Sequence, residues 1–283
     1  MDYSRSNTAG MNTAIGIVCV LFSAPLCSVL SAQMPIDIKD AQESSHAIPP
    51  CNNSTELQKR AELAENRLKD WAVLGFYKNE NLHLQTLTDA DDRVVFMGDS
   101  ITGFWFLGKF FPRKPYLNRA IAGQVTGQML LRFRRDVVHL KPKVVVILGG
   151  INDLRQSSTP STVEEIENNL ASMSEIAKAN GIKVVLASIL PVGRKEAPAS
   201  VETPEMSRRR IAFGDSITAI NTWLQDYARS NGHTYCDYYS AMINQDNILK
   251  SEFTDDGLHP NETGYSVMAP IAKRSIELAI VQH

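Results

Sequence analysis

The chain has 283 residues, which is enough for one large domain with a buried core. Apolar residues make up 43% and charged residues 21%, and this ordinary composition excludes a disordered, collagen-like or multi-spanning membrane protein. The formal net charge is −2, and no run of like charge is longer than the three arginines at 208–210, so we expect no nucleic-acid partner.

The N-terminus contains an uncharged segment, residues 13–30, that follows Arg5 and the free amine and precedes small residues. This arrangement is typical of a secretory signal peptide, so residues 1–32 predict export to the periplasm or out of the cell. The alternative is an uncleaved segment that anchors the protein, because its length approaches that of a bilayer span. Residues 33–54 are rich in Pro, Asp, Ser and Asn and predict a flexible linker.

The sequence predicts no metal site, because no spacing of Cys and His resembles a zinc motif. Two of the four cysteines lie inside the N-terminal apolar segment. The remaining two, Cys51 and Cys236, could pair in an oxidising compartment, and the sequence leaves that question open.

Residues 55–283 are expected to form one domain that begins with a helix. Apolar residues from Leu57 to Trp71 recur at spacings of three and four, which places them on one helical face. Further along, short apolar runs at 94–97, 144–148 and 184–190 predict strands that are buried on both faces, and a fourth strand is expected near 116–118. Helical patterns occur at 129–140, 163–176, 217–227 and 261–281. This alternation predicts an α/β fold whose ligands bind beyond the carboxyl ends of the strands.

Three of the loops expected at those strand ends carry candidate catalytic residues. Ser100 ends a Gly-Asp-Ser sequence after the first strand, where a hydroxyl and a backbone N–H at a helix start suit an acyl-transfer nucleophile. Gly123 follows the second strand and allows a close approach by its backbone N–H. Asn152 follows the third strand, and its amide is a neutral donor suited to a developing oxyanion. Each pattern alone is equally well explained by turn or cap chemistry.

A serine nucleophile needs a base, and two of the histidines follow an aspartate by three residues. Asp256 and His259 lie in a Gly- and Pro-containing loop before the last helix, where the carboxylate can orient the imidazole. Asp136 and His139 lie in a helical pattern and are expected to make a local contact on a solvated helix face.

The sequence Gly-Asp-Ser-Ile-Thr occurs a second time, at 214–218. No buried strand precedes this copy, and a helical pattern follows it. Asp215 or Ser216 is therefore expected to cap a helix, and Ser216 is not favoured as the nucleophile.

In order and spacing, Gly98-Asp99-Ser100, Gly123, Gly150-x-Asn152-Asp153 and Asp256-x-x-His259 resemble the motifs of the SGNH hydrolases, the GDSL-type esterases and lipases. The resemblance covers residues 93–275 and is strongest to a bacterial, lysophospholipase-like branch. It implies a flavodoxin-like, three-layer α/β/α domain with a central parallel sheet of about five strands. It also implies hydrolysis of acyl or acetyl esters of lipids or carbohydrates, without a metal or organic cofactor.

The resemblance further assigns roles to five residues. It implies that Ser100 is the nucleophile and that His259 is the general base, oriented by Asp256. The oxyanion hole would consist of the backbone N–H groups of Ser100 and Gly123 and the side chain of Asn152.

Two alternatives to a hydrolase stay open at this point. An O-acyltransferase acting on cell-envelope glycans would use the same residues, and a non-catalytic binding module would keep only the fold. The segment at residues 192–213 is longer and more charged than the resemblance leads us to expect, and its composition indicates a polar insertion. The aromatic cluster at 104–111 is expected to belong to the core rather than to an acyl pocket.

Overall fold

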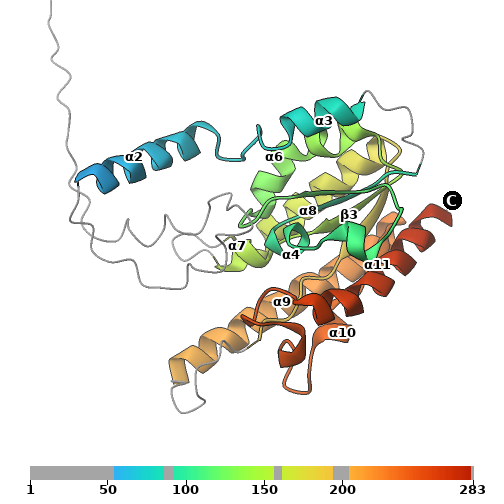
Figure 1. The fold of residues 1–283 in the computed structure, drawn as a ribbon. Helices are drawn as coiled ribbons and strands as arrows, with labels where there is room; N and C mark the ends of the chain where they lie inside the picture. The colour runs from blue at the N-terminus through green and yellow to red at the C-terminus, as the bar shows by residue number, and fades with distance from the viewer. Residues whose placement is uncertain (1–53, 86–91, 156–160, 194–203, 282–283) are drawn as a thin grey trace, which may run out of the picture.

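Figure 1 shows the computed structural model of the chain, which describes residues 54–85, 92–155, 161–193 and 204–281. The expected signal segment at 1–32, the linker up to residue 53 and Cys51 lie outside these residues.

A parallel sheet of five strands, in the order β2-β1-β3-β4-β5, forms the centre of the domain. Every residue of the two central strands, β1 and β3, is buried, which explains why both read as continuous apolar runs. The strand order is that of flavodoxin-like sheets, so the expected fold is confirmed. The strands are β1 (Val94–Gly98), β2 (Tyr116–Ala120), β3 (Val144–Leu148), β4 (Lys183–Ala187) and β5 (Thr234–Cys236).

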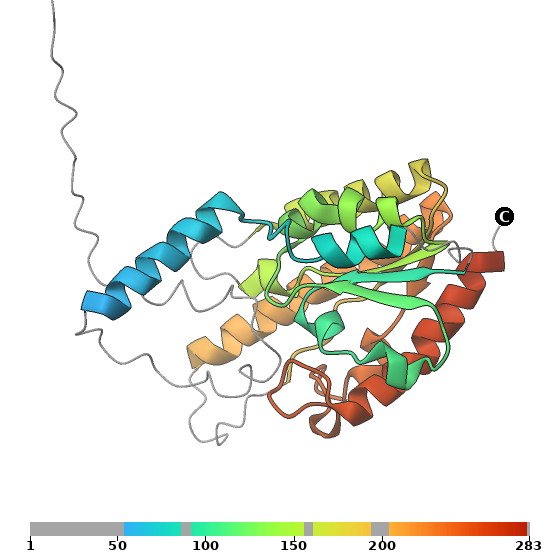
Figure 2. The same cartoon turned by 45° about the horizontal axis from the view of Figure 1, so that its top comes forward.

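Helices cover both faces of the sheet and give the three layers that the sequence predicts (Figures 1 and 2). One face is covered by α6 (Thr126–Asp136), α8 (Val163–Ala179) and α9 (Pro204–Asn231). The other face is covered by α4 (Ser100–Gly103), α5 (Leu107–Phe110) and α11 (Glu262–Val281). Short helical turns connect these elements: α7 (Ile151–Arg155), α10 (Tyr239–Met242), and 3-10 turns at Val138–Leu140 and Ser251–Phe253.

Two helices precede the sheet: α2 (Ser54–Lys69) and α3 (Lys78–Gln85). In both cartoon views α2 stands apart from the sheet, whereas α3 lies beside α6. The segment between them is bound to the end of β2, because the Tyr77 hydroxyl donates a 2.6 Å hydrogen bond to the Ala120 carbonyl. The segment between α2 and α3 therefore contacts the sheet.

The second Gly-Asp-Ser copy lies inside a helix, so the expectation that it caps one is wrong. Helix α9 begins at Pro204, ten residues before Gly214, and the Ser216 hydroxyl donates to the Ala212 carbonyl of the preceding turn. Residues 204–213, which we expected to belong to a polar insertion, form the first turns of the same helix. Apolar periodicity is the pattern that reveals a helix in a sequence. This part of α9 is charged and lacks that periodicity, so the sequence did not indicate a helix here.

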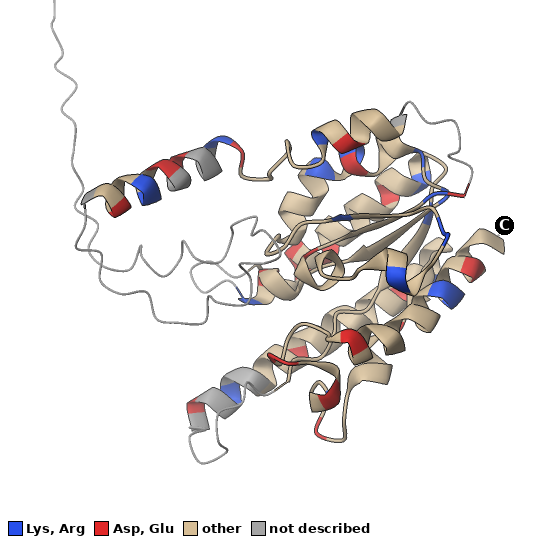
Figure 3. Ribbon diagram, viewed as in Figure 1, with Lys and Arg blue, Asp and Glu red and all other residues tan. Residues whose placement is uncertain are grey.

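Charged side chains are spread over the described part of the chain. In Figure 3, the ribbon segments coloured for Lys and Arg and those coloured for Asp and Glu are distributed over many helices and loops. None of the described helices is both long and apolar enough to cross a membrane. Within the same residues, no cluster of three or more His, Cys, Asp or Glu side chains is placed to hold a metal ion.

Candidate active site

Ser100 is held at the carboxyl end of β1 by a tight turn. A Cβ atom on Gly98 would lie 2.4 Å from Thr102 Oγ1 and 2.9 Å from the Leu148 carbonyl oxygen, so only glycine fits there. Asp99 caps α4 by accepting a 3.0 Å hydrogen bond from the Ile101 N–H. This turn places Ser100 at the start of α4 with its side chain at the sheet edge.

The loop before α11 brings an imidazole to the serine hydroxyl. His259 Nε2 lies 2.9 Å from Ser100 Oγ, and His259 Nδ1 lies 2.6 Å from Asp256 Oδ2. The Thr254 hydroxyl closes the loop, donating to the His259 carbonyl at 2.8 Å and accepting the Gly257 N–H at 3.0 Å. Two segments that are 159 residues apart in sequence therefore meet at one hydroxyl.

Asp256 is an ionised carboxylate in this arrangement. Its Oδ1 accepts the backbone N–H groups of Leu258 at 2.9 Å and His259 at 2.8 Å, while its Oδ2 faces the imidazole. Burial raises the pKa of Asp256, but the hydrogen bonds from His259 and Leu258 outweigh burial and hold that pKa below its usual range. A negative charge beside Nδ1 favours the tautomer that leaves Nε2 free to accept a proton.

Backbone and side-chain donors lie at the ends of β1, β2 and β3. Gly123 has a φ of +76°, a conformation that favours glycine. The N–H groups of Ser100 and Gly123 donate to no acceptor among the residues that the structure describes. Asn152 is half-buried at the start of α7, and its Nδ2 donates to the Gln124 carbonyl at 3.0 Å. One of its two N–H bonds is used there, which leaves the second for a ligand.

A buried carboxylate fixes the loop that carries Asn152. Asp153 is 1% exposed and accepts the Thr126 N–H at 3.0 Å and the Thr126 hydroxyl at 2.5 Å. These bonds join the start of α7 to the start of α6. The loops that carry Gly123 and Asn152 are therefore joined by the hydrogen bonds between Thr126 and Asp153.

Asp99, beside the serine, is fully buried. Burial and the nearby charge of Asp153 raise the pKa of Asp99 to about 7, despite the hydrogen bond from Ile101. Its Oδ2 has no hydrogen-bond partner in the described part of the chain.

Asp136 is not on a solvated helix face, so the expectation for the Asp136–His139 pair is wrong. Asp136 is 1% exposed, and its carboxylate accepts hydrogen bonds from Asn81 at 2.7 Å and Arg132 at 3.1 Å. His139 is exposed. The sequence did not reveal the burial of Asp136, because Asn81 comes from another helix, α3, and meets Asp136 only in the folded chain.

A comparison with known families shows which family this chain belongs to. The sequence profile of the GDSL-like Lipase/Acylhydrolase family matches residues 96–267, which include Ser100, Gly123, Asn152, Asp256 and His259. The chain belongs to this family. It is a family of carboxylic ester hydrolases.

The relatives of this chain match different fractions of its length. A GDSL-like lipase from Bacteroides thetaiotaomicron, whose crystal structure is known, is 37% identical in sequence. The two structures match with a TM-score of 0.65 over 74% of this chain and 100% of the lipase. The uncharacterized lipoprotein YqeF of Bacillus subtilis is 34% identical over 79 residues, or 27% of this chain and 32% of YqeF. An acetylxylan esterase of Xylanibacter ruminicola is 28% identical over 153 residues, or 50% of this chain and 30% of the esterase. The chain thus spans about a third of the length of the curated relatives it matches.

The aromatic residues that follow Ser100 divide between the core and the site. Trp105 and Phe111 are buried, at 3% and 5% exposed, as expected for core residues. Phe104 is half-buried, and its ring centre lies 5.1 Å from that of His259. Phe106 is 73% exposed, so the core assignment is wrong for this residue.

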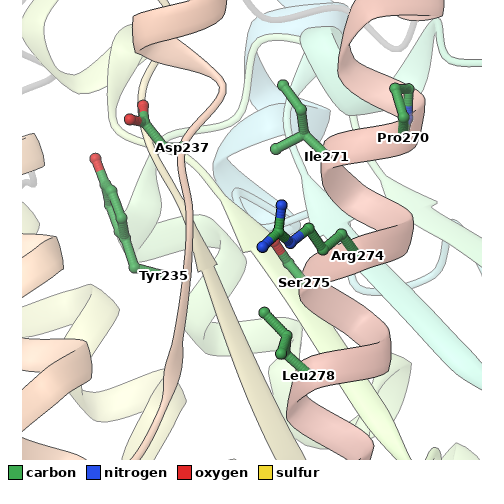
Figure 4. A pocket seen from close by; sticks show the side chains of 7 residues that line it. All are labelled: Tyr235, Asp237, Pro270, Ile271, Arg274, Ser275 and Leu278. Atoms are coloured by element: carbon green, nitrogen blue, oxygen red, sulfur yellow. The ribbon is translucent and has the colours of Figure 1, made fainter.

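A shallow hollow of about 400 Å³ lies apart from these residues, between α11 and the end of β5 (Figure 4). Its lining contains neither Ser100 nor His259 nor Asp256. The lining residues are Tyr235, Asp237, Pro270, Ile271, Arg274, Ser275 and Leu278. Cys236, in β5, does not line this hollow. Its thiol is fully buried, and burial raises the pKa of the thiol to about 11.

Proposed function

We propose that this chain is a serine esterase that hydrolyses carboxylic esters through an acyl-enzyme on Ser100. The observation that carries the proposal is the continuous contact from Asp256 through His259 to the Ser100 hydroxyl, at 2.6 and 2.9 Å. Both distances are within hydrogen-bond range, which a general base needs to take a proton from its nucleophile.

In the first half of the reaction, Ser100 Oγ attacks the ester carbonyl while His259 Nε2 accepts its proton. The Asp256 carboxylate stabilises the imidazolium that forms. The negative charge on the substrate oxygen is stabilised by the N–H groups of Ser100 and Gly123 and by the Asn152 amide. His259 then gives its proton to the leaving alcohol, and the acyl group stays on Ser100.

In the second half, His259 accepts a proton from a water molecule that attacks the acyl-enzyme. The same donors stabilise the second tetrahedral intermediate. His259 returns the proton to Ser100 Oγ as the carboxylic acid leaves. One imidazole therefore serves both half-reactions.

The proposed substrates are acyl or acetyl esters of lipids or carbohydrates outside the cytoplasm. The similarity to an acetylxylan esterase supports acetylated glycans, and the similarity to a lipoprotein supports export. We also infer that residues 1–32 direct this export and that residues 55–283 form one catalytic domain behind a linker. The apolar character of residues 13–30 supports the first point.

Hydrolysis of p-nitrophenyl acetate, butyrate and octanoate tests the proposal. The wild type and Ser216→Ala should release p-nitrophenol at similar rates, whereas Ser100→Ala should be inactive. Ser216→Ala is a matched control, because both serines lie in the same five-residue sequence. Activity that survives in Ser100→Ala would refute the assignment, and acyl transfer to an added glycan in preference to water would identify an acyltransferase.

A further inference from the structure

The guanidinium group of Arg132, on α6, is buried behind the candidate active site. Arg132 is 0% exposed and is among the largest fully buried side chains of the described residues. A buried guanidinium is costly unless its donors are paired and its charge is neutralised. Asp136 supplies the opposite charge at 3.1 Å, four residues along the same helix.

The remaining donors of Arg132 reach two backbone carbonyls and one side-chain oxygen close to the site. Nη2 donates to the Gly98 carbonyl at 3.2 Å, two residues before Ser100. Nη1 donates to the Arg119 carbonyl at 2.6 Å, at the end of β2. Nε donates to Gln124 Oε1 at 2.5 Å, one residue after Gly123.

Gln124 extends this network to Asn152. Its backbone carbonyl accepts the Asn152 amide at 3.0 Å, and its Nε2 donates to the Ala72 carbonyl at 2.9 Å. Gln124 is 2% exposed, so its side chain has little freedom to move. The orientation of the Asn152 amide therefore depends on a loop that Arg132 holds.

Three contacts of Arg132 thus lie close in sequence to the donors of the proposed oxyanion hole. Gly98 is two residues before Ser100, and Arg119 is four residues before Gly123. Gln124 follows Gly123, and its carbonyl binds the Asn152 amide. A planar guanidinium with five N–H donors in a fixed fork suits this task, whereas a lysine ammonium has three donors and no fixed plane.

We propose that Arg132 is a positioning residue of the esterase site, which holds the three oxyanion-hole donors in one arrangement. The inference rests on the proposed function. Arg132 touches neither substrate nor the reacting atoms, so it acts through Gly98, Arg119 and Gln124. Replacing the guanidinium group of Arg132 should weaken stabilisation of the transition state more than it weakens binding of the ground-state ester.

The test compares Arg132→Lys with Arg93→Lys. Arg93 is a matched control, because it is a buried arginine that donates to the Leu140 carbonyl at 2.7 Å, next to the amino end of β1. Both variants should be less stable than the wild type towards urea. We expect only Arg132→Lys to lose kcat, by about 10- to 100-fold, with KM for p-nitrophenyl acetate within about twofold of the wild type.

Phenylboronic acid supplies the second readout, because it forms a tetrahedral adduct with an active serine. Its affinity for Arg132→Lys should fall by about the same factor as kcat, which a purely structural role would not produce. Gln124→Leu removes one arm of the network and retains the size of the side chain. We expect kcat to fall at least fivefold, and this variant decides the question if Arg132→Lys does not fold.

Two outcomes would overturn the proposal. One is a kcat within twofold of the wild type in a folded Arg132→Lys, or in Gln124→Leu where Arg132→Lys is insoluble. The other is an equal loss of kcat in Arg93→Lys, which would show that any buried arginine has the same effect. Failure of the proposed function is distinguishable, because the wild type and Arg93→Lys would then also lack activity.

Discussion

Replacing Asn152 with alanine removes one proposed donor from the oxyanion hole and leaves Ser100, His259 and Asp256 in place. One N–H of the Asn152 amide is occupied by the Gln124 carbonyl at 3.0 Å, so the substitution removes a single N–H aimed at the substrate. Loss of one such donor raises the barrier by about 3 kcal/mol. We therefore expect kcat to fall by roughly 100- to 200-fold.

The effect on folding should be smaller than the effect on catalysis. Alanine leaves the carbonyl of the buried Gln124 without the Asn152 amide, at a cost of about 1 kcal/mol in the free energy of unfolding. Urea denaturation measures this term, and initial rates with p-nitrophenyl acetate measure kcat and KM. In Asn152→Asp, a carboxylate would face the developing negative charge, and kcat should fall at least as far. A loss of kcat below threefold in Asn152→Ala would refute the role given to this amide.

Three further predictions follow from the same geometry. Asp256→Asn should lower kcat by about 1,000- to 10,000-fold, because an amide favours the wrong imidazole tautomer. Asp255 is the neighbouring, exposed residue, and kcat of the control variant Asp255→Asn should stay within about twofold of the wild type. Asp99 has a pKa raised to about 7, so its ionisation opposes folding and the wild type should lose about 2 to 3 kcal/mol of stability between pH 5 and 8. Asp99→Asn should lack this loss in urea denaturation, and parallel pH profiles for the two proteins would contradict the raised pKa. Gly98→Ala should lower the free energy of unfolding by about 2 kcal/mol or more, since its Cβ would lie 2.4 Å from Thr102 Oγ1. A Gly98→Ala protein of normal stability would contradict that steric argument.

The central strands could be predicted from sequence, because burial on both faces leaves a local signal. The apolar runs at 94–97 and 144–148 are each followed directly by glycine, and the structure has strands there. The last strand, Thr234–Cys236, has three residues and only its first and third are buried. So short a segment has no detectable periodicity, and the sequence did not predict it.

Candidate site residues were recognisable where chemistry and loop position coincide, as in the segments around Ser100 and His259. Their distances were not predictable, since segments 159 residues apart must fold before they meet. Arg132 gave no signal, because arginine within a helical pattern usually lies on the surface. Its burial depends on Asp136 and on backbone carbonyls from β1 and β2, and these contacts exist only in the folded chain.

The central claim is that Ser100 Oγ is the activated nucleophile, and covalent labelling with a fluorophosphonate tests it most directly. The account predicts that peptide mass spectrometry finds the phosphonate on Ser100 in the wild type and in Ser216→Ala, and that Ser100→Ala and His259→Ala label at least 100-fold more slowly. Modification of Ser216 in the Ser100→Ala protein, or labelling at the wild-type rate without His259, would contradict the account.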